Sequence, residues 1–276
     1  MATQKKKLVR STRKVEEKAA QSGTTWKPTD EARQKSVMYR WIAAVLWVLA
    51  IAGEVYAIFG VLPQVPINMV LLIVLIVVIG LLAVGGNLLW RKANKLNPAS
   101  EKNKMAFWFQ NQLGAIITVI AFLPLIILIL ANKDMSAKQK ALAGGIGIVV
   151  AAVAMWTGME FNSNSVEQMT AEQNQIIAIT GTDEVFWTKA GGVYHLCEAA
   201  DYVNQASQDN TIYSGTIAQA NAEGKRAPSQ QTIKTESTQC GFEYISLEDL
   251  EAQLIDGDDS ETDLPSDDAT DEETDG

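Results

Sequence analysis

The chain has 276 residues and a formal net charge of -9 at pH 7, but its charges are segregated. Residues 1–40 hold eleven Lys or Arg against four acids, whereas residues 256–276 hold eleven acids and no base. The basic run at the start has no interleaved aromatic residues, which disfavours nucleic-acid binding. The sequence contains no GxGxxG, P-loop, GxSxG or HExxH motif. We therefore expect a protein that is not an enzyme and has no nucleic-acid partner.

Residues 1–40 form a basic arm in front of the first apolar segment. Seven of its basic residues fall between Lys5 and Lys18, and a stretch containing Gly23 and Pro28 follows. The arm lacks the short apolar core of a signal peptide, so we expect it to be retained. We expect it to be loosely ordered, to set the topology through its charge and to contact anionic lipid.

Four apolar segments between residues 41 and 158 are each about long enough to cross roughly 30 Å of hydrocarbon as a helix. They cover about residues 41–62, 68–90, 107–130 and 141–158. Pro63 and Pro66 end the first segment, so the second must turn straight back. We therefore expect an integral protein of the plasma membrane, built as an α-helical bundle of four transmembrane helices.

The third and fourth segments each carry an unusual feature. Pro124 lies inside the third, where a neighbouring helix can cover the carbonyl group that the proline frees. In the fourth, Ala141 with Gly145 and Gly147 with Ala151 place small residues four apart. This spacing permits close helix contact, although glycine is also generally frequent in membrane helices.

Basic residues around the segments predict their orientation. The loop 91–105 holds five basic residues against one acid, whereas the turn 63–68 is uncharged. By the positive-inside rule, the arm and this loop are cytoplasmic, and four crossings return the C-terminal region to the cytoplasm. The loop 131–140, with three lysines against one acid, opposes this orientation of the fourth segment. The alternative makes the Pro124 segment re-entrant and places the C-terminal region outside the cytoplasm.

Residues 165–255 are expected to form a small α+β soluble domain. Ser165 with Gln168 is a capping box that begins an amphipathic helix, and Gly181 ends it. The stretches 185–189 and 193–196, joined through two glycines, predict a β-hairpin. We expect this domain to fold without the rest of the chain.

Shorter elements complete the predicted domain. They are a helix at 198–203, a strand at 211–214 and a helix at 216–222 that begins with a second capping box, Thr216 with Gln219. From residue 256 onward the chain is mostly Asp, Glu, Ser and Thr, which cannot bury enough apolar surface to offset the entropy of ordering. Residues 256–276 are therefore expected to be a disordered acidic tail.

Glu54 is the only acidic residue within an apolar segment. An ionisable group at that depth is costly and is a functional candidate by default. It can serve a small transporter or channel component, or it can be a structural group hydrogen-bonded inside the bundle. No Lys, Arg or His lies within the other segments to pair with it.

His195, Cys197 and Cys240 are the candidate metal ligands. On a strand His195 and Cys197 face the same side, and with Cys240 they supply three of the four ligands of a tetrahedral zinc site. His-x-Cys with one distant cysteine is a weak pattern, so three alternatives stay open: a zinc or thiol site, a Cys197–Cys240 disulfide, or free thiols. No other cofactor is expected.

Several runs resemble an uncharacterised group of actinobacterial membrane proteins. They are LLWRKANKLNPASEKNK at 88–104, NQLGAIITVIAFLPLIILILANKDMSAKQK at 111–140, EVFWTKAGGVYHL at 184–196 and TIYSGTIAQANAEGK at 211–225. The resemblance implies four spans followed by a small metal-binding module with a Tyr-His pair, a later Cys and a closing C-x-x-C. Tyr194 and His195 match, but Cys197 falls earlier than that group's Cys and only Cys240 stands where the C-x-x-C is expected.

These observations favour a membrane-anchored module that binds a ligand or a protein partner. A transporter or channel component that uses Glu54 is the first alternative. A degenerate zinc or thiol site at His195, Cys197 and Cys240 is the second.

Overall fold

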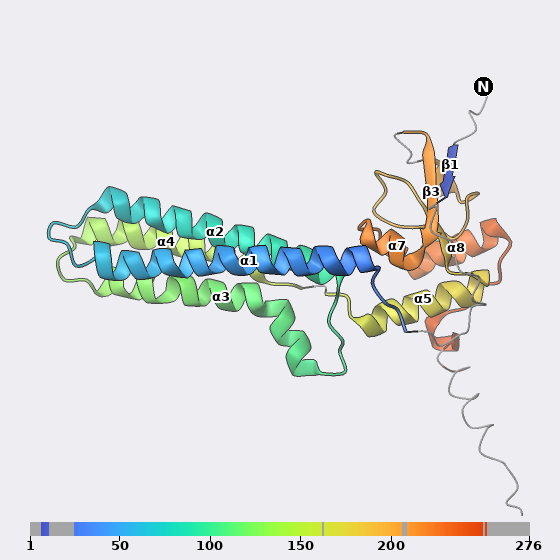
Figure 1. The fold of residues 1–276 in the computed structure, drawn as a ribbon, viewed down its shortest axis with the longest axis horizontal. Helices are drawn as coiled ribbons and strands as arrows, with labels where there is room; N and C mark the ends of the chain where they lie inside the picture. Colours follow the sequence, from blue (N-terminus) through green and yellow to red (C-terminus); the bar gives the residue numbers. More distant parts are fainter. Residues whose placement is uncertain (1–6, 11–24, 162, 206–208, 251, 253–276) are drawn as a thin grey trace, which may run out of the picture.

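The computed structural model describes residues 7–10, 25–161, 163–205, 209–250 and 252. Its helices and strands form two parts, an elongated bundle of long helices and a small domain at one end of that bundle (Figure 1). The acidic tail and half of the basic arm lie outside the described residues. In the other half, residues 7–10 form a strand and residues 30–40 belong to a helix, so the prediction of a loosely ordered arm is wrong for these residues.

Four long helices make up the bundle, and each is long and apolar enough to cross a membrane. They are α1 (Asp30–Tyr56), continued by the π-helical turn η1 (Ala57–Val61), α2 (Met69–Leu96), α3 (Lys104–Ala131) and α4 (Ala137–Gly158). Thr29, Asn68, Asn103 and Ser136 cap their N-termini through side-chain oxygens. The four predicted apolar segments are confirmed as helices. The caps at Thr29, Asn103 and Ser136 explain why α1, α3 and α4 begin before their apolar segments, whereas α2 begins at Met69, close to the predicted start.

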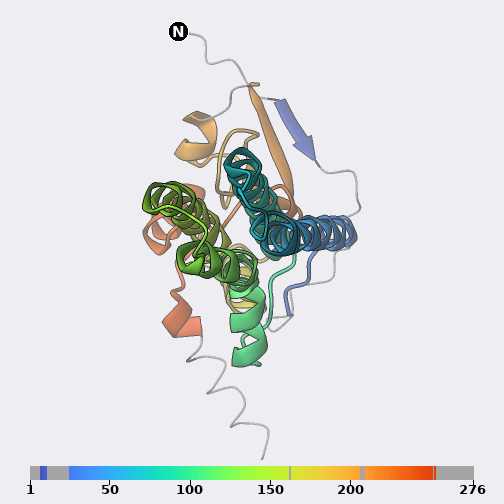
Figure 2. The same ribbon diagram turned by 90° about the vertical axis from the view of Figure 1, so that its left-hand side faces the viewer.

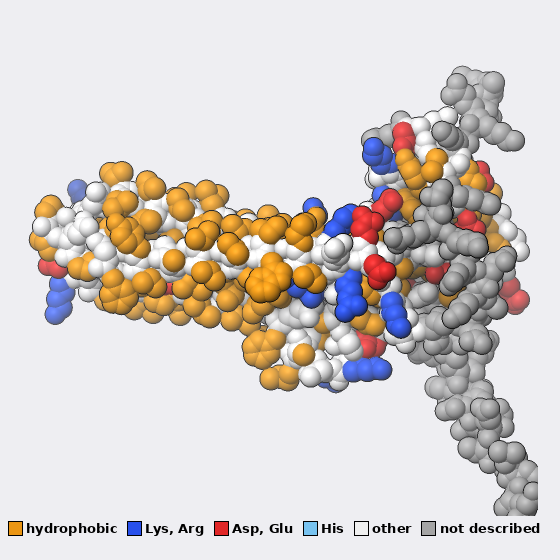
Figure 3. All heavy atoms as spheres, viewed as in Figure 1, with side chains coloured by type: hydrophobic (Ala, Val, Ile, Leu, Met, Phe, Trp, Pro, Cys, Tyr) orange, Lys and Arg blue, Asp and Glu red, His pale blue; other side chains and the backbone are white. Residues whose placement is uncertain are grey.

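The bundle keeps an apolar outer surface. Large apolar side chains are exposed on all four helices, among them Val48, Leu81, Ile127 and Val149. Figure 3 shows apolar side chains over the visible face of the bundle and Lys and Arg side chains where it meets the domain. An exposed apolar surface of this extent marks an interaction site, and around four helices of this length it is typical of contact with lipid.

Asn87 links all four helices inside the bundle. Its Nδ2 donates to Thr118 Oγ1 of α3 at 3.1 Å and to the Ala154 carbonyl oxygen of α4 at 2.7 Å, and its Oδ1 accepts from Trp47 Nε1 of α1 at 3.1 Å. Because Asn87 is fully buried, these bonds satisfy an amide that would otherwise be costly there.

Helices α3 and α4 approach most closely at glycines. A Cβ atom added at Gly158 would lie 2.5 Å from the backbone of Gly114 and Ala115. Gly144 and Gly147 are also buried against α3, but Gly145 is exposed and has nothing within 4 Å. Of the two predicted pairs, Ala141 and Gly145 are both exposed and do not bring the helices together. In the second pair, Gly147 is buried against Ile126 of α3 and Ala151 is half-buried against the core.

Replacing Gly158 by valine is expected to push α4 away from α3 and to lower the stability of the bundle by about 1–3 kcal/mol, the usual cost of overpacking. Thermal unfolding of the purified protein in detergent measures this loss. Gly145→Val is the matched control on the same helix, and equal losses in the two variants would argue against the close contact.

The small domain contains short helices around a three-stranded sheet. Its elements are α5 (Val166–Thr180), β2 (Glu184–Trp187), α6 (Asp201–Gln205), β3 (Thr211–Thr216), α7 (Ile217–Ala222) and α8 (Gln230–Cys240), joined by β1 (Lys7–Arg10) from the basic arm. The strand order is β1-β3-β2, with β1 parallel and β2 antiparallel to β3. In Figure 2 this domain lies beyond the bundle, whose helices are seen end-on.

Both predicted capping boxes are present. Ser165 with Gln168 begins α5, Thr216 with Gln219 begins α7, and Gly181 ends α5 in the left-handed conformation. The predicted hairpin is present only in part, because the main partner of β2 is β3. Residues 193–196 reach β2 through a single bridge, in which Phe186 and His195 exchange two backbone hydrogen bonds of 2.9 and 2.6 Å.

The N-terminal segment before α1 belongs to the core of the domain. Trp26 is 2 % exposed and packs with Met169, Tyr194, Ile217 and other buried side chains of residues 165–245. Its Nε1 donates to Asn221 Oδ1 at 3.2 Å. The core of the domain thus includes Trp26, which lies outside the predicted boundary of 165–255.

Candidate functional site

The candidate ligands His195, Cys197 and Cys240 come together at the C-terminal end of α8. Cys197 and Cys240 form a disulfide with Cα atoms 6.1 Å apart, so the structure contains the disulfide among the three alternatives. Their sulfurs are then not the thiolates that zinc requires. Among the residues that the structure describes, no group of three or more His, Cys, Asp or Glu side chains is placed to hold a metal ion.

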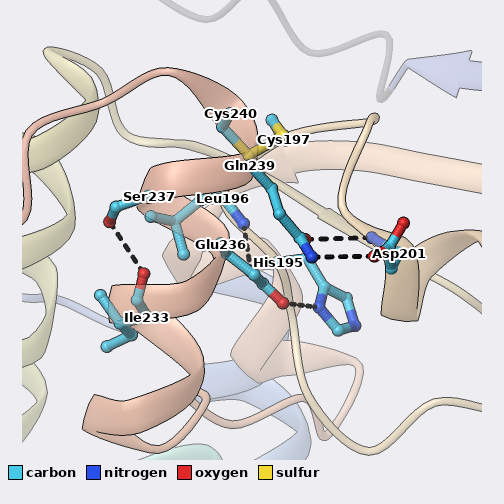
Figure 4. The surroundings of a disulfide bond; sticks show 9 residues. All are labelled: His195, Leu196, Cys197, Asp201, Ile233, Glu236, Ser237, Gln239 and Cys240. Atoms are coloured by element: carbon cyan, nitrogen blue, oxygen red, sulfur yellow. Dashed lines mark hydrogen bonds and ion pairs between the residues drawn. A yellow bond between two sulfur atoms is a disulfide. The ribbon is translucent and has the colours of Figure 1, made fainter.

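His195 is held by a carboxylate that the sequence did not indicate. Glu236, on the turn of α8 before Cys240, lies with Oε1 2.6 Å from His195 Nδ1, and its Oε2 accepts from Leu196 N at 3.1 Å (Figure 4). His195 is 5 % exposed and Glu236 is fully buried. The His195–Glu236 pair therefore joins α8 to the segment before Cys197. The disulfide between Cys197 and Cys240 joins the same segment to the end of α8.

Replacing Glu236 by alanine is expected to lower the free energy of unfolding by about 1–3 kcal/mol. Alanine removes both carboxylate oxygens, so the Leu196 N–H loses its acceptor and His195 Nδ1 loses its partner. Chemical denaturation measures the effect. Thr235→Ala, one residue earlier on the exposed side of α8, is the control, and we expect it to change stability by less than about 0.5 kcal/mol.

Tyr194, the neighbour of His195, serves the core. It is fully buried, and among the described residues its hydroxyl has no hydrogen-bond partner. Burial raises the pKa of Tyr194 well above its ordinary value, and the charges of Glu172 and Asp183 raise it further. Burial also raises the pKa of Asp183, to about 6. Tyr194 thus packs in the core of the domain, close to two acidic groups.

Glu54 lies inside the bundle and faces α3. It is 4 % exposed, and its Oε1 accepts from Leu125 N, next to Pro124, at 3.3 Å. No salt bridge joins it to a basic residue in the described part of the chain. α3 is one continuous helix through Pro124, so the structure does not contain the re-entrant segment of the alternative topology.

A polar pocket of about 520 Å³ lies where the bundle meets the domain. Four basic residues line it: Arg91 and Lys95 from α2, and Lys225 and Arg226 from the segment after α7. One acid, Glu160, lies just after α4 and is 7 % exposed. We call this cavity the junction pocket.

Several groups in the junction pocket lack hydrogen-bond partners among the described residues. They are Arg91 Nε, Asn111 Nδ2 and Glu160 Oε2. Arg91 Nε and Glu160 Oε1 are 3.8 Å apart, an ion pair that is too long for a hydrogen bond. Burial raises the pKa of Glu160, while the charges of Arg91 and Lys95 oppose that rise.

Direct hydrogen bonds join the domain to the end of the bundle. Gln112 Nε2 of α3 donates to the Glu160 carbonyl oxygen at 3.1 Å, and Glu101 N donates to Glu167 Oε2 of α5 at 2.7 Å. Val166 N donates to the Ala99 carbonyl oxygen at 3.1 Å. Of these residues Glu160 lines the junction pocket, and the other bonds link α5 to the loop between α2 and α3.

No sequence pattern indicates this pocket, because its residues come from four separated stretches. The loop 91–105, which contributes Arg91, Asn94 and Lys95, stands out in the sequence only by its charge. No protein family, curated protein or solved structure matches this chain.

Proposed function

We propose that the chain is a multi-pass protein of the plasma membrane that holds a small domain against one membrane surface as a ligand-binding module. The junction pocket is the observation that carries this proposal. It combines a basic lining with buried polar groups that lack partners, and such groups are costly unless a ligand or water completes their hydrogen bonds.

Replacing Phe161 by a photoreactive amino acid tests whether the junction pocket binds a ligand. Phe161 lines the pocket and is 65 % exposed. Illumination of membranes is expected to attach a ligand there, detected by mass spectrometry of the purified chain. Phe59, 76 % exposed on η1 at the opposite end of the bundle, is the control position. The same adducts at both positions, or none at Phe161, would refute a ligand site at the junction.

We further propose that the domain and the N-terminus lie in the cytoplasm. Nine basic residues lie beside the domain, in residues 27–40 and 91–104 (Figure 1). Three lie at the opposite end of the bundle, in residues 133–140. The nine are Lys27, Arg33, Lys35, Arg40, Arg91, Lys92, Lys95, Lys102 and Lys104, and the three are Lys133, Lys138 and Lys140. This asymmetry supports a cytoplasmic domain. The disulfide favours the opposite side, and so do the three lysines of the loop 131–140.

Thiol labelling of intact cells decides the orientation. With a cytoplasmic domain, a membrane-impermeant reagent leaves Cys197 and Cys240 unlabelled before and after reduction by an impermeant reductant. A permeabilised sample supplies the positive control. Labelling of intact cells after reduction would place the domain outside. Transport through Glu54 remains the alternative proposal, supported by the burial of its carboxylate inside the bundle.

A further inference from the structure

The geometry points to a phosphate ester that also carries a hydroxyl group as the ligand of the junction pocket. A phosphatidylglycerol headgroup and a soluble glycerol phosphate share this chemistry. The inference rests on the proposed function, because it assigns a ligand class to the same pocket.

The charge of the side chains that line the pocket favours an anionic ligand. Four basic residues line the pocket against one acid. Lys225 Nζ is committed to the domain, since it donates to the carbonyl oxygens of Lys189 at 3.0 Å and Gly191 at 2.6 Å. Lys95 and Arg226 are exposed, and no hydrogen bond or ion pair of their side chains is recorded among the described residues. They are therefore available to a phosphate group, which both side chains bind well.

A buried amide lines the pocket. Asn111 is 5 % exposed, and its Oδ1 accepts from Asn94 Nδ2 in a long hydrogen bond of 3.5 Å. In this orientation Asn111 Nδ2 has no hydrogen-bond partner among the described residues, and neither has Arg91 Nε. Neighbouring atoms cover both nitrogens, so phosphate oxygens can accept from them after a rotation of these side chains.

Glu160 favours an anionic ligand that also carries a hydrogen-bond donor. Its carboxylate repels an inorganic phosphate ion, which offers mainly acceptors and negative charge. Its Oε2 has no hydrogen-bond partner among the described residues but is covered by neighbouring atoms. After a rotation of the side chain, Oε2 can accept a hydrogen bond from a hydroxyl group of the ligand. A ligand with an ionised phosphate beside Lys95 and Arg226 and a hydroxyl beside Glu160 satisfies both sides of the pocket.

The position of the pocket favours a lipid as the source. Trp156 near the end of α4 and Phe161 after it have ring centroids 5.3 Å apart, and both rings are mostly exposed. Aromatic side chains at the end of an apolar helix are typical of the headgroup level of a bilayer. The volume of about 520 Å³ lies within the range of about 300–1,000 Å³ usual for small ligands.

The test uses the full chain in phosphatidylcholine nanodiscs. Binding is measured for short-chain phosphatidylglycerol, glycerol 3-phosphate and inorganic phosphate. Lys95→Gln and Arg226→Gln are each expected to weaken binding of the phosphatidylglycerol about tenfold or more, the usual effect of losing one charge-assisted hydrogen bond. Lys92→Gln is the control, since Lys92 lies on the same helix, is exposed and does not line the pocket.

The inference is supported if the wild-type chain binds the phosphatidylglycerol more tightly than inorganic phosphate. In addition, Lys95→Gln and Arg226→Gln should lose this binding while Lys92→Gln keeps it. Equally tight binding of glycerol 3-phosphate also supports it and identifies a soluble ester as the source. No binding, equal effects of all three substitutions, or phosphate binding as tight as that of the esters would overturn it. If an adduct still forms at position 161, the binding module stands and only its ligand class is wrong.

Discussion

Truncation of Trp26 to alanine is expected to lower the free energy of unfolding of the domain by about 3–5 kcal/mol, the usual cost of removing a large buried aromatic side chain. The indole is 2 % exposed, and its Nε1 bond to Asn221 Oδ1 would be lost with it. Chemical denaturation of the full chain in detergent measures the loss. Hydrogen exchange in α5 and α7 locates it, because both helices contribute to the same core.

Trp41→Ala is the matched control for this prediction. Trp41 lies on α1 and is 71 % exposed, so its truncation should leave hydrogen exchange in the domain unchanged. An equal loss in both variants, or none in Trp26→Ala, would show that the segment before α1 is not part of the domain core. For the same reason, a fragment of residues 165–254 is expected to be much less stable than the domain within the full chain.

Removing the Cys197–Cys240 disulfide is expected to lower the free energy of unfolding by about 2–4 kcal/mol. The bond closes a loop with a sequence separation of 43 residues, so its loss gives the unfolded chain more conformational freedom. Unfolding of the wild-type protein with and without reductant measures the effect.

The variant with both cysteines replaced by serine is the control. It should match the reduced wild-type protein in stability and should not respond to reductant. A reductant effect of the same size in this variant would show that the disulfide is not its cause. Wild-type stability that is unchanged by reduction would show that Glu236 and the core hold α8 in place without the bond.

The bundle could be predicted from the sequence because its signals are local. A run of apolar residues identifies each helix wherever the others lie, and capping boxes such as Ser165 with Gln168 involve residues only three apart. The basic loop after α2 likewise predicts an orientation without any knowledge of packing.

The domain was harder to predict because its main contacts are distant in sequence. Leu8 in β1 pairs with Ile212 in β3, and Trp26 packs against residues that follow the whole bundle. Pattern alone paired β2 with the nearest extended stretch, 193–196, whereas β3 forms the longer ladder. Helix α8 was missed because its sequence is almost entirely polar, so no apolar stripe marked it.

The candidate site was predicted only in part. His195, Cys197 and Cys240 were recognised by residue type, but spacing could not decide between a metal site and a disulfide. Glu236, the partner of His195, follows it by 41 residues and carries no motif. The junction pocket was out of reach, because nothing in the sequence brings Arg91, Glu160 and Arg226 together.

Native mass spectrometry of the full chain, released from nanodiscs of mixed phosphatidylcholine and phosphatidylglycerol, tests most directly whether the junction pocket is a ligand site. We predict that the wild-type chain retains phosphatidylglycerol, and that Lys95→Gln and Arg226→Gln lose it while Lys92→Gln keeps it. Release of the wild-type chain without bound lipid, or equal retention by all four proteins, would contradict the proposed site.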